Sequence, residues 1–492
     1  MKLKKIFPIL IICLVLICSI NAISAISDEN DVIGSNQSDD LISECDDQQL
    51  SITDSDTLTT TQQETTLQAT ADESSAVQSA TAQTLSPYQQ FSNDLNSGQG
   101  TVYLNGDIQI SKPFEIRHNV VIDGNSHSID GQSKTNIFRV YSSTLTLKNI
   151  ILKNGHAVQG GAIYCLYGNL NIDGCTFLSN VANEGGAIYQ SHGSLIVTNS
   201  HFQSNKVESS KYRGHGGAIY FYNGHSKITK STFKSNSCIA KSLKKHSKAT
   251  KYQFSGGAIY FNEGSTHEVS ECTFQGNKAS NHGGAIYAYK PKNLKINKCT
   301  FKKNRVVFED GGAITFNGKK LSITNSNFYN NKAYEDGGVM DALSLTKQKT
   351  RISISGCTFQ GNIANKGGGV FWMGKKTVFT MKNSKFIKNK ATIAGVFNAE
   401  DTNAKISKCV FQGNKATKVT SWKMKAKNGH VLKHTGGVIM MNKKVVKFIK
   451  CTFKSNSATF GGVAYHKTGK LTFTGCKYAA NKAKSGPKVK KE

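Results

Sequence analysis

The amino-acid sequence predicts an all-β fold: a right-handed parallel β-helix, or solenoid, of about 12 coils with an N-terminal capping helix. Three observations predict it. A short motif recurs through most of the chain, strand-like alternation precedes most copies, and a pair of glycines follows most of them. Because a stacked scaffold does not identify a function by itself, the functional residues have to be found separately.

The motif is an aromatic residue followed three positions later by asparagine. It occurs in eleven copies, at Phe177, Phe202, Phe233, Phe274, Phe301, Phe328, Phe359, Phe386, Phe411, Phe453 and Tyr478. The basic interval is 25 to 27 residues, and insertions lengthen some copies. A repeat of this length predicts one structural unit that is stacked many times.

Each repeat predicts three short strands. The residues seven and five positions before the motif aromatic are mostly apolar, as in Leu170 and Ile172, with a more polar residue between them. This alternation is typical of a strand with one buried face. We expect the motif aromatic on a second strand, and the Ala-Ile-Tyr segment after the glycine pair on a third.

Three columns of equivalent residues should hold the coils together. The motif asparagines should form an amide ladder, and asparagine tolerates the left-handed turn that a corner needs. The glycine pairs predict positive φ or close backbone approach. Two residues before the motif aromatic, cysteine and serine alternate, which favours a small interior slot with reduced thiols. Disulfides between adjacent coils, such as Cys272 with Cys299, are the alternative in a secreted protein.

The first 85 residues precede the predicted fold. Residues 1–27 are typical of a secretory signal peptide, because Lys2, Lys4 and Lys5 precede an apolar run. A retained membrane anchor is the alternative, although the run is short for a span. Residues 28–85 are rich in Ser, Thr, Gln and acidic residues and contain no Lys or Arg, which predicts a disordered acidic spacer.

The remaining chain is expected to contain three segments: an N-terminal cap and first coils at 86–150, β-helix repeats at 151–481, and a basic tail at 482–492. In the cap, Ser86 is a candidate N-cap residue, Pro87 the first helical residue and Gly98 the stop. Tyr88, Phe91 and Leu95 would share the face that covers the open end of the solenoid. An imperfect first coil is expected from Leu145 to Asn154.

The formal net charge of +30 points to anionic partners, because the acidic spacer leaves the solenoid even more cationic. Two Lys-rich insertions, at 237–255 and 415–435, fall at the same point of the coil and are the candidate contact surface. The alternative is an insertion without a ligand. The candidate binding residues are Lys241, Lys244, Lys245, Lys248, Lys251, Lys415, Lys418, Trp422, Lys423, Lys425, Lys427 and Lys433.

Two acidic pairs are the candidates for catalysis. Glu309-Asp310 and Glu335-Asp336 each stand directly before a glycine pair in neighbouring repeats. Stacking would place Asp310 and Asp336 about 5 Å apart, a distance compatible with a glycoside hydrolase. Other repeats carry His, Ser, Thr or Phe at that position, which is typical of a variable, solvent-facing corner. We therefore expect no catalysis. No Cys-x-x-Cys spacing occurs, and neither a metal nor a cofactor is expected.

The repeat pattern Cys/Ser-Thr-Phe-x-x-Asn-x-Ala, followed by Gly-Gly-Ala-Ile-Tyr, resembles the repeats of chlamydial polymorphic outer membrane proteins. It is still more similar to adhesin-like surface proteins of methanogenic archaea, as is the lead-in Gly-Thr-Val-Tyr-Leu-Asn-Gly-Asp-Ile from Gly100. The resemblance covers about residues 85–481 and implies a secreted, pectin-lyase-like β-helix at the cell surface with a role in cell adhesion.

These observations predict a secreted, noncatalytic, adhesin-like protein. Its expected partners are anionic cell-wall or surface glycans, including those of a host or neighbouring cell, with no specific nucleic acid. No transmembrane anchor is expected after signal cleavage, and the membrane or wall-binding modules of the related proteins are missing. We therefore expect retention by charge on an anionic wall. A polysaccharide lyase or glycoside hydrolase acting on acidic glycans is the first alternative, and inert wall armour is the second.

Overall fold

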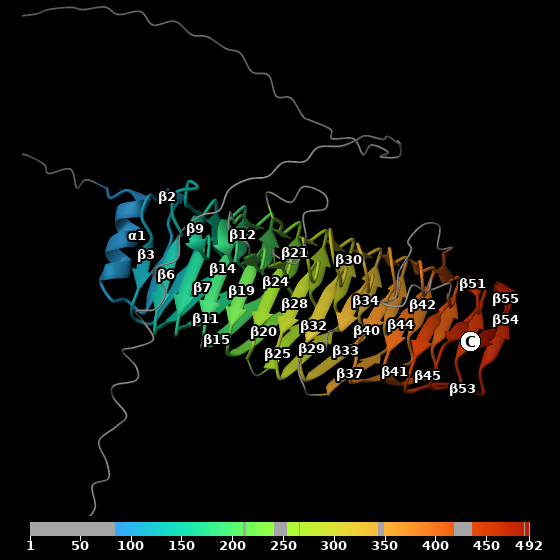
Figure 1. The fold of residues 1–492 in the computed structure, drawn as a ribbon. Coiled ribbons are helices and arrows are strands. Elements are labelled where there is room, and N and C mark those ends of the chain that lie inside the picture. Colours follow the sequence, from blue (N-terminus) through green and yellow to red (C-terminus); the bar gives the residue numbers. More distant parts are fainter. Residues whose placement is uncertain are drawn as a thin grey trace, which may run out of the picture. The chain divides into compact units, whose positions relative to one another are not determined.

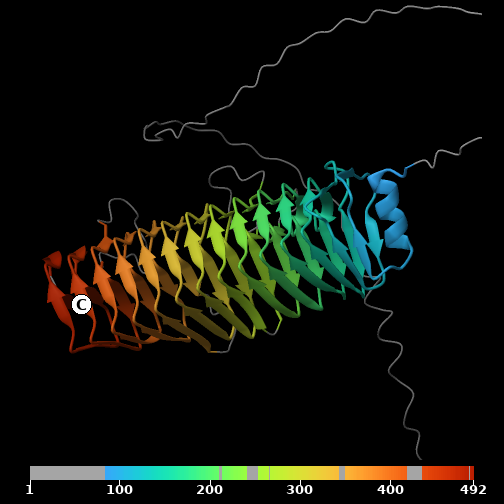
Figure 2. The same ribbon diagram turned by 180° about the vertical axis from the view of Figure 1, so that it is seen from behind.

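The structure is a computed structural model that describes residues 84–209, 213–240, 253–264, 266–342, 349–417, 435–486 and 488–491. Within this part of the chain, parallel strands stack coil upon coil, as Figures 1 and 2 show from opposite sides. The predicted signal peptide and nearly all of the predicted spacer lie outside the described residues. The described part contains no helix long and apolar enough to cross a membrane.

The coils form four parallel sheets of 14 strands each. The first sheet contains the strand that begins each coil. Its strands are β1 (Thr101–Tyr103), β4 (Val120–Asp123), β7 (Thr144–Lys148), β11 (Asn169–Asp173), β15 (Ser194–Thr198), β20 (His225–Thr229), β25 (Thr266–Ser270), β29 (Asn293–Asn297), β33 (Lys320–Thr324), β37 (Thr350–Ser355), β41 (Thr377–Lys382), β45 (Asn403–Ser407), β49 (Val445–Ile449) and β53 (Lys470–Thr474).

The second sheet carries the motif aromatic residues. Its strands are β2 (Ile108–Gln109), β5 (Ser128–Asp130), β8 (Ile151–Lys153), β12 (Thr176–Leu178), β16 (His201–Gln203), β21 (Thr232–Lys234), β26 (Thr273–Gln275), β30 (Thr300–Lys302), β34 (Asn327–Tyr329), β38 (Thr358–Gln360), β42 (Lys385–Ile387), β46 (Val410–Gln412), β50 (Thr452–Lys454) and β54 (Lys477–Ala479).

The third sheet follows the motif asparagines, and most of its strands are only two residues long. They are β9 (His156–Gln159), β13 (Val181–Glu184), β17 (Lys206–Val207), β18 (Arg213–His215), β22 (Ser237–Cys238), β23 (Gln253–Ser255), β27 (Lys278–Ala279), β31 (Arg305–Val306), β35 (Lys332–Ala333), β39 (Ile363–Ala364), β43 (Lys390–Ala391), β47 (Lys415–Ala416), β51 (Ser457–Phe460) and β55 (Lys482–Ser485).

The fourth sheet closes each coil after the glycine pair. Its strands are β3 (Phe114–Ile116), β6 (Phe138–Tyr141), β10 (Ile163–Leu166), β14 (Ile188–Ser191), β19 (Ile219–Tyr222), β24 (Ile259–Asn262), β28 (Ile286–Tyr289), β32 (Ile314–Asn317), β36 (Met340–Ala342), β40 (Phe371–Met373), β44 (Phe397–Glu400), β48 (Ile439–Asn442), β52 (Ala464–His466) and β56 (Val489–Lys491).

The predicted parallel β-helix is confirmed, and the structure adds turns at both ends. Of the 14 strands of the first sheet, β1 and β4 precede the predicted coils, which leaves 12 from β7 to β53. The expected first coil at Leu145 is therefore the third, because β1 and β4 already pair with each other and β4 pairs with β7. The expected basic tail also joins the solenoid, since β55 and β56 pair with β51 and β52.

The coil has four strands where the sequence predicted three. The three predicted strands are present in the first, second and fourth sheets, and β11 shows the expected burial of Leu170 and Ile172. The additional strand of the third sheet is too short for a period-two pattern to reveal it. In β27, for example, Lys278 is exposed and Ala279 is buried.

The helix α1 (Pro87–Asn96) is capped as predicted. Ser86 accepts a hydrogen bond from the backbone N–H of Gln89, and the Gln89 side chain bonds back to the backbone N–H of Ser86. Phe91 and Leu95 are buried, and the Phe91 ring meets Phe114 edge-on at 5.1 Å between centroids. Tyr88, expected on the same face, is 45% exposed. It lies at the rim of the contact, with its ring centroid 6.0 Å from that of Phe114.

Two columns of side chains connect every coil of the repeat. The Phe177 and Phe202 rings are stacked with centroids 4.5 Å apart, and the same stacking continues to Phe453 and Tyr478. The motif asparagines form the predicted amide ladder, from the bond between Nδ2 of Asn180 and Oδ1 of the next asparagine at 3.0 Å onward. Side-chain amides that are satisfied inside the coil therefore fix the register of the stack.

The corner turns differ in one respect from expectation. The motif asparagines are not among the described residues with positive φ; instead the residue directly before each takes that conformation, as at Ser179 with φ of 57°. The asparagine points inward, so its neighbour makes the turn. In the glycine pairs, both expected roles are present. Gly160 has φ of 61°, and a Cβ on Gly161 would clash with the carbonyl oxygen of Gly186 in the next coil.

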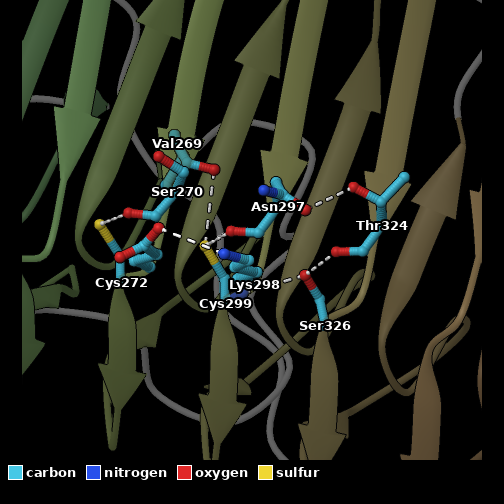
Figure 3. Close-up of polar contacts among 9 residues, drawn as sticks. Val269, Ser270, Cys272, Asn297, Lys298, Cys299, Thr324 and Ser326 are labelled. Atoms are coloured by element: carbon cyan, nitrogen blue, oxygen red, sulfur yellow. Dashed lines mark hydrogen bonds and ion pairs between the residues drawn. The ribbon is translucent and has the colours of Figure 1, made fainter.

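The cysteines of the described residues are all free thiols, so the structure holds no disulfide there. Figure 3 shows how serine fills the same slot: the backbone N–H of Cys299 donates to Oγ of Ser326 at 3.0 Å, and that Oγ donates to the Thr324 carbonyl at 2.7 Å. The Cys299 thiol donates to the Asn297 carbonyl at 3.3 Å in the same way. Cysteine and serine therefore play the same local role.

Candidate functional site

The predicted binding residues fall almost entirely outside the described part of the chain. Lys415 alone is described; it is exposed on β47, at the start of the second Lys-rich insertion. The predicted binding residues that lie outside the described residues are Lys241, Lys244, Lys245, Lys248, Lys251, Lys418, Trp422, Lys423, Lys425, Lys427 and Lys433.

Lys415 belongs to a row of cations on the outer face of the third sheet. In successive coils it pairs in register with Lys390, and Arg305 pairs with both Lys278 and Lys332. We call this row the cation column; it consists of Lys206, Lys278, Arg305, Lys332, Lys390, Lys415 and Lys482, all exposed. Uncharged residues interrupt it in three coils, at Ser237, Ile363 and Ser457. None of the seven forms an ion pair with another described residue.

Stacking concentrates positive charge along this column. Neighbouring parallel strands lie about 4.8 Å apart, so Lys278, Arg305 and Lys332 carry three like charges on three adjacent strands. Like charges directly opposite each other repel and destabilise a sheet. A linear polyanion lying along the column would relieve that repulsion. The column is therefore a candidate binding surface for an extended, negatively charged polymer.

Sequence reasoning missed the cation column, although a signal was present. Its residues are those directly after the motif asparagine, as in Asn277-Lys278 and Asn304-Arg305. Because the asparagine points inward, the next residue on the short strand has to point outward. The third sheet was not predicted, and its outward positions therefore could not be recognised.

The predicted acidic residues do lie together. Asp310 and Asp336 occupy equivalent corners in successive coils, because the backbone N–H of Gly283 donates to the carbonyl of Asp310 and that of Gly311 to the carbonyl of Asp336. Oxygen atoms of Asp310, Glu335 and Asp336 lie within 4.8 Å of one another. His282 occupies the same corner one coil earlier, in register with Asp310.

Asp310 and Asp336 are half-buried at this corner, so the prediction of a fully solvent-facing position is wrong. At the equivalent position His215 is 9% exposed, and Ser255 and Thr435 are each 1% exposed. Outward-pointing residues of the fourth sheet cover the corner: the ring centroid of Tyr260 lies 4.3 Å from that of His215. The tyrosine of the Ala-Ile-Tyr segment thus packs outside the coil, against the residue before the glycine pair.

Asp341 joins the acidic corner from the fourth sheet. It lies on β36 in register with Thr315, which is in register with Tyr287. Val339-Met340-Asp341 therefore stands where five earlier repeats have Ala-Ile-Tyr, and this change from tyrosine to aspartate was the signal that sequence reasoning missed. We call the group His282, Glu309, Asp310, Glu335, Asp336 and Asp341 the acidic cluster.

Hydrogen bonds orient most members of the acidic cluster. His282 Nε2 lies 2.9 Å from Oε2 of Glu309, and Glu335 forms an ion pair with Lys366. Oδ1 of Asp310 accepts a hydrogen bond from the backbone N–H of Asp336 at 2.8 Å. Asp336 in turn accepts one from the backbone N–H of Gly367 at 2.6 Å. Asp310, Glu335 and Asp336 are thus each bonded to the following coil, whereas Glu309 is bonded to the preceding one.

Burial perturbs the titration of the cluster. It raises the pKa of Asp310 to about 6 and that of Asp336 to about 7, and the nearby Asp310 carboxylate adds to the rise at Asp336. Burial also raises the pKa of Asp341 well above its ordinary value, with further contributions from Asp310 and Asp336. Such carboxyls can carry a proton near neutral pH, which makes them candidates for proton transfer or cation binding.

Comparison with known proteins supports the fold and the repeat. A family model described as right handed beta helix region matches residues 245–411 and 341–489. A model described as Chlamydia polymorphic membrane protein repeat matches residues 174–191, which contain the first copy of the motif. No curated protein and no solved structure matches the chain. The right hand of the solenoid and the chlamydial resemblance are thus confirmed, whereas the resemblance to archaeal surface proteins stays a prediction.

Proposed function

We propose that this protein is a secreted, cell-surface, adhesin-like β-helix that binds anionic wall or surface glycans and has no catalytic activity. The observation that carries the proposal is the cation column, in which Lys278, Arg305 and Lys332 follow one another on adjacent strands without ion pairs to the described residues. A row of three adjacent cations attracts a linear polyanion more strongly than it attracts a small anion.

The chlamydial repeat supports a location at the cell surface, because that family model is named for membrane proteins. The signal-like N-terminus supports secretion. The Lys-rich insertion at 415–435 begins at Lys415, which is a member of the column. Charge on an anionic wall would retain the protein at the cell surface.

The test is retention of the full chain on immobilised polygalacturonate and on isolated cell walls across a salt gradient. The triple variant Lys278→Gln, Arg305→Gln, Lys332→Gln should elute at markedly lower salt than the wild type. A matched control changes three exposed lysines of the first sheet, Lys227, Lys405 and Lys447, to glutamine and lowers the net charge equally. If both triple variants lower the eluting salt concentration equally, binding depends on net charge and not on the column. Retention that does not change with salt concentration would refute the proposal.

The acidic cluster keeps a second candidate function open, a polysaccharide lyase or glycoside hydrolase acting on acidic glycans. The raised pKa values of Asp310 and Asp336 favour it, because acid catalysis needs a carboxyl that is protonated near neutral pH. Incubation with acidic polysaccharides, followed by assay for new reducing or unsaturated ends, tests it. Activity that disappears in the Asp310→Asn, Asp336→Asn double variant would support the enzyme over the adhesin.

A further inference from the structure

The acidic cluster contains a buried carboxylate that surface binding does not use. Asp341 is 0% exposed, and neither Oδ1 nor Oδ2 has a hydrogen-bond partner among the described residues. A buried carboxylate without partners is costly unless it holds a proton or meets a cation. In a chain with a net charge of +30, a group of five carboxylates at one corner also needs an explanation.

Geometry places three possible ligands around one point. One ligand atom each from His282, Asp310 and Asp341 lies within 4.8 Å of the other two. Two ligands of a single ion are separated by at most twice the metal–ligand distance, which is about 4 Å for zinc and nearly 5 Å for calcium. Small movements of the side chains would therefore bring all three onto one ion.

The contacts of His282 are those of a metal ligand. Glu309 engages Nε2 at 2.9 Å, and the buried Nδ1 has no hydrogen-bond partner among the described residues. Metal-binding histidines commonly use one ring nitrogen for the ion, while a carboxylate holds the other and fixes the ring. Asp310 is oriented in a comparable way, because its Oδ1 accepts a backbone N–H from the next coil.

We propose that His282, Asp310 and Asp341 bind one divalent first-row transition-metal ion, with Glu309 holding the histidine in place. One imidazole with two carboxylates suits zinc or manganese better than calcium or magnesium, which prefer oxygen ligands alone. Glu335 and Asp336 lie next to Asp310 and add negative charge that would attract the cation.

The ion would act as a staple between coils. The three ligands come from three successive coils, since His282 follows β27, Asp310 follows β31 and Asp341 lies on β36. At this place the stacked tyrosines of the fourth sheet end, because Thr315 and Asp341 follow Tyr287 in register. Metal binding would thus replace the packing that the tyrosines provide in earlier coils. The sequence predicted no metal site because its ligands are spread over three repeats.

The test begins with dialysis of the full chain against a chelator. The metal-free chain is then titrated separately with ZnCl₂, MnCl₂ and CaCl₂, and calorimetry measures the binding. We expect one zinc or manganese ion per chain, weaker binding of calcium, and a higher melting temperature in the bound state. Asp341→Asn and His282→Asn should each weaken zinc binding at least tenfold, and Glu309→Gln should weaken it roughly 10- to 100-fold. Glu271→Gln, an exposed carboxylate elsewhere in the solenoid, is the matched control and should change nothing.

Folding of the variants is checked independently of metal. Asp341→Asn keeps the shape of the side chain and removes the buried charge, so the metal-free variant should melt at or above the temperature of the metal-free wild type. A wild-type chain that binds none of the three ions would overturn the proposal and leave Asp341 as a protonated acid. Calcium binding as tight as zinc, unaffected by His282→Asn, would overturn the transition-metal assignment.

Discussion

Nδ2 of Asn304 donates a hydrogen bond to Oδ1 of Asn331, 3.0 Å away in the next coil. The same Nδ2 donates to the carbonyl of Phe274 in the preceding coil at 2.9 Å, and Oδ1 of Asn304 accepts from Asn277 at 2.9 Å. One buried side chain therefore joins three coils. Because every coil of the repeat contains such an amide, a stack of interchangeable units keeps a single register.

Asn304→Ala should lower the free energy of unfolding by about 3 kcal/mol or more, because it leaves several buried polar groups unsatisfied at roughly 1–3 kcal/mol each. Asn481→Ala, in the half-buried last copy of the motif, should lower the free energy of unfolding clearly less than Asn304→Ala does. Urea unfolding followed by circular dichroism measures both variants. Equal losses would mean that burial and neighbours do not determine the contribution of the amide ladder.

Cys299→Ser should change the stability by less than about 1.5 kcal/mol, because the neighbouring Ser326 already makes the equivalent bonds in the same slot. The Cys175 and Cys357 thiols should also resist alkylation in the native chain, since burial raises the pKa of Cys175 to about 12 and that of Cys357 to about 11. Thiol titration with and without denaturant tests this expectation. Formation of a Cys272–Cys299 disulfide under mild oxidation of the native chain would contradict it.

His267 should make the solenoid sensitive to acid. Burial lowers its pKa from 6.5 to about 4, and its ring lies between Oγ of Ser226 and the carbonyl oxygen of Glu263 at 2.9 and 3.0 Å. Between these two pH values the unfolded chain binds a proton that the folded chain does not bind, so stability falls as the pH falls. Between pH 6.5 and 4 the free energy of unfolding should fall by about 3 kcal/mol more in the wild type than in His267→Gln.

The measurement is the unfolding free energy of both chains at several pH values between 6.5 and 4. Other groups that titrate in this range contribute equally to both, so only the difference is diagnostic. His201→Gln, at an exposed position of β16, is the control and should follow the wild type. Parallel pH profiles for wild type and His267→Gln would show that the buried ring does not remain neutral.

Arg305→Gln should stabilise the protein at low salt by roughly 0.2–1 kcal/mol, because it removes a cation between Lys278 and Lys332. The gain should vanish at 1 M salt, where screening already suppresses the repulsion. Lys227→Gln serves as the control, since Lys227 stands in register with Glu268 and its loss should give no gain. Melting temperatures at both salt concentrations test the prediction, which fails if Arg305→Gln is destabilising at low salt.

The acidic cluster illustrates what a repeat pattern reveals and what it hides. Asp310 and Asp336 could be placed side by side from the sequence, because stacking follows directly from the spacing of the motif. Their burial could not be predicted, since it depends on tyrosines that point outward from a different sheet of the coil. Asp341 was missed for the same reason: it faces the cluster across a corner, at a distance that depends on how the chain turns between two strands.

By itself, the sequence determined the architecture of this protein: the parallel stack, the inward asparagine and aromatic columns, and the capping helix at Ser86. These features repeat or are local, so the pattern of side chains contains the information that specifies them. Tertiary structure alone decided where the outer side chains meet. The cation column and the corner with His282, Asp310 and Asp341 arise because stacked coils bring residues from separate repeats within a few ångströms. A contact between different sheets of the coil leaves no period in the sequence.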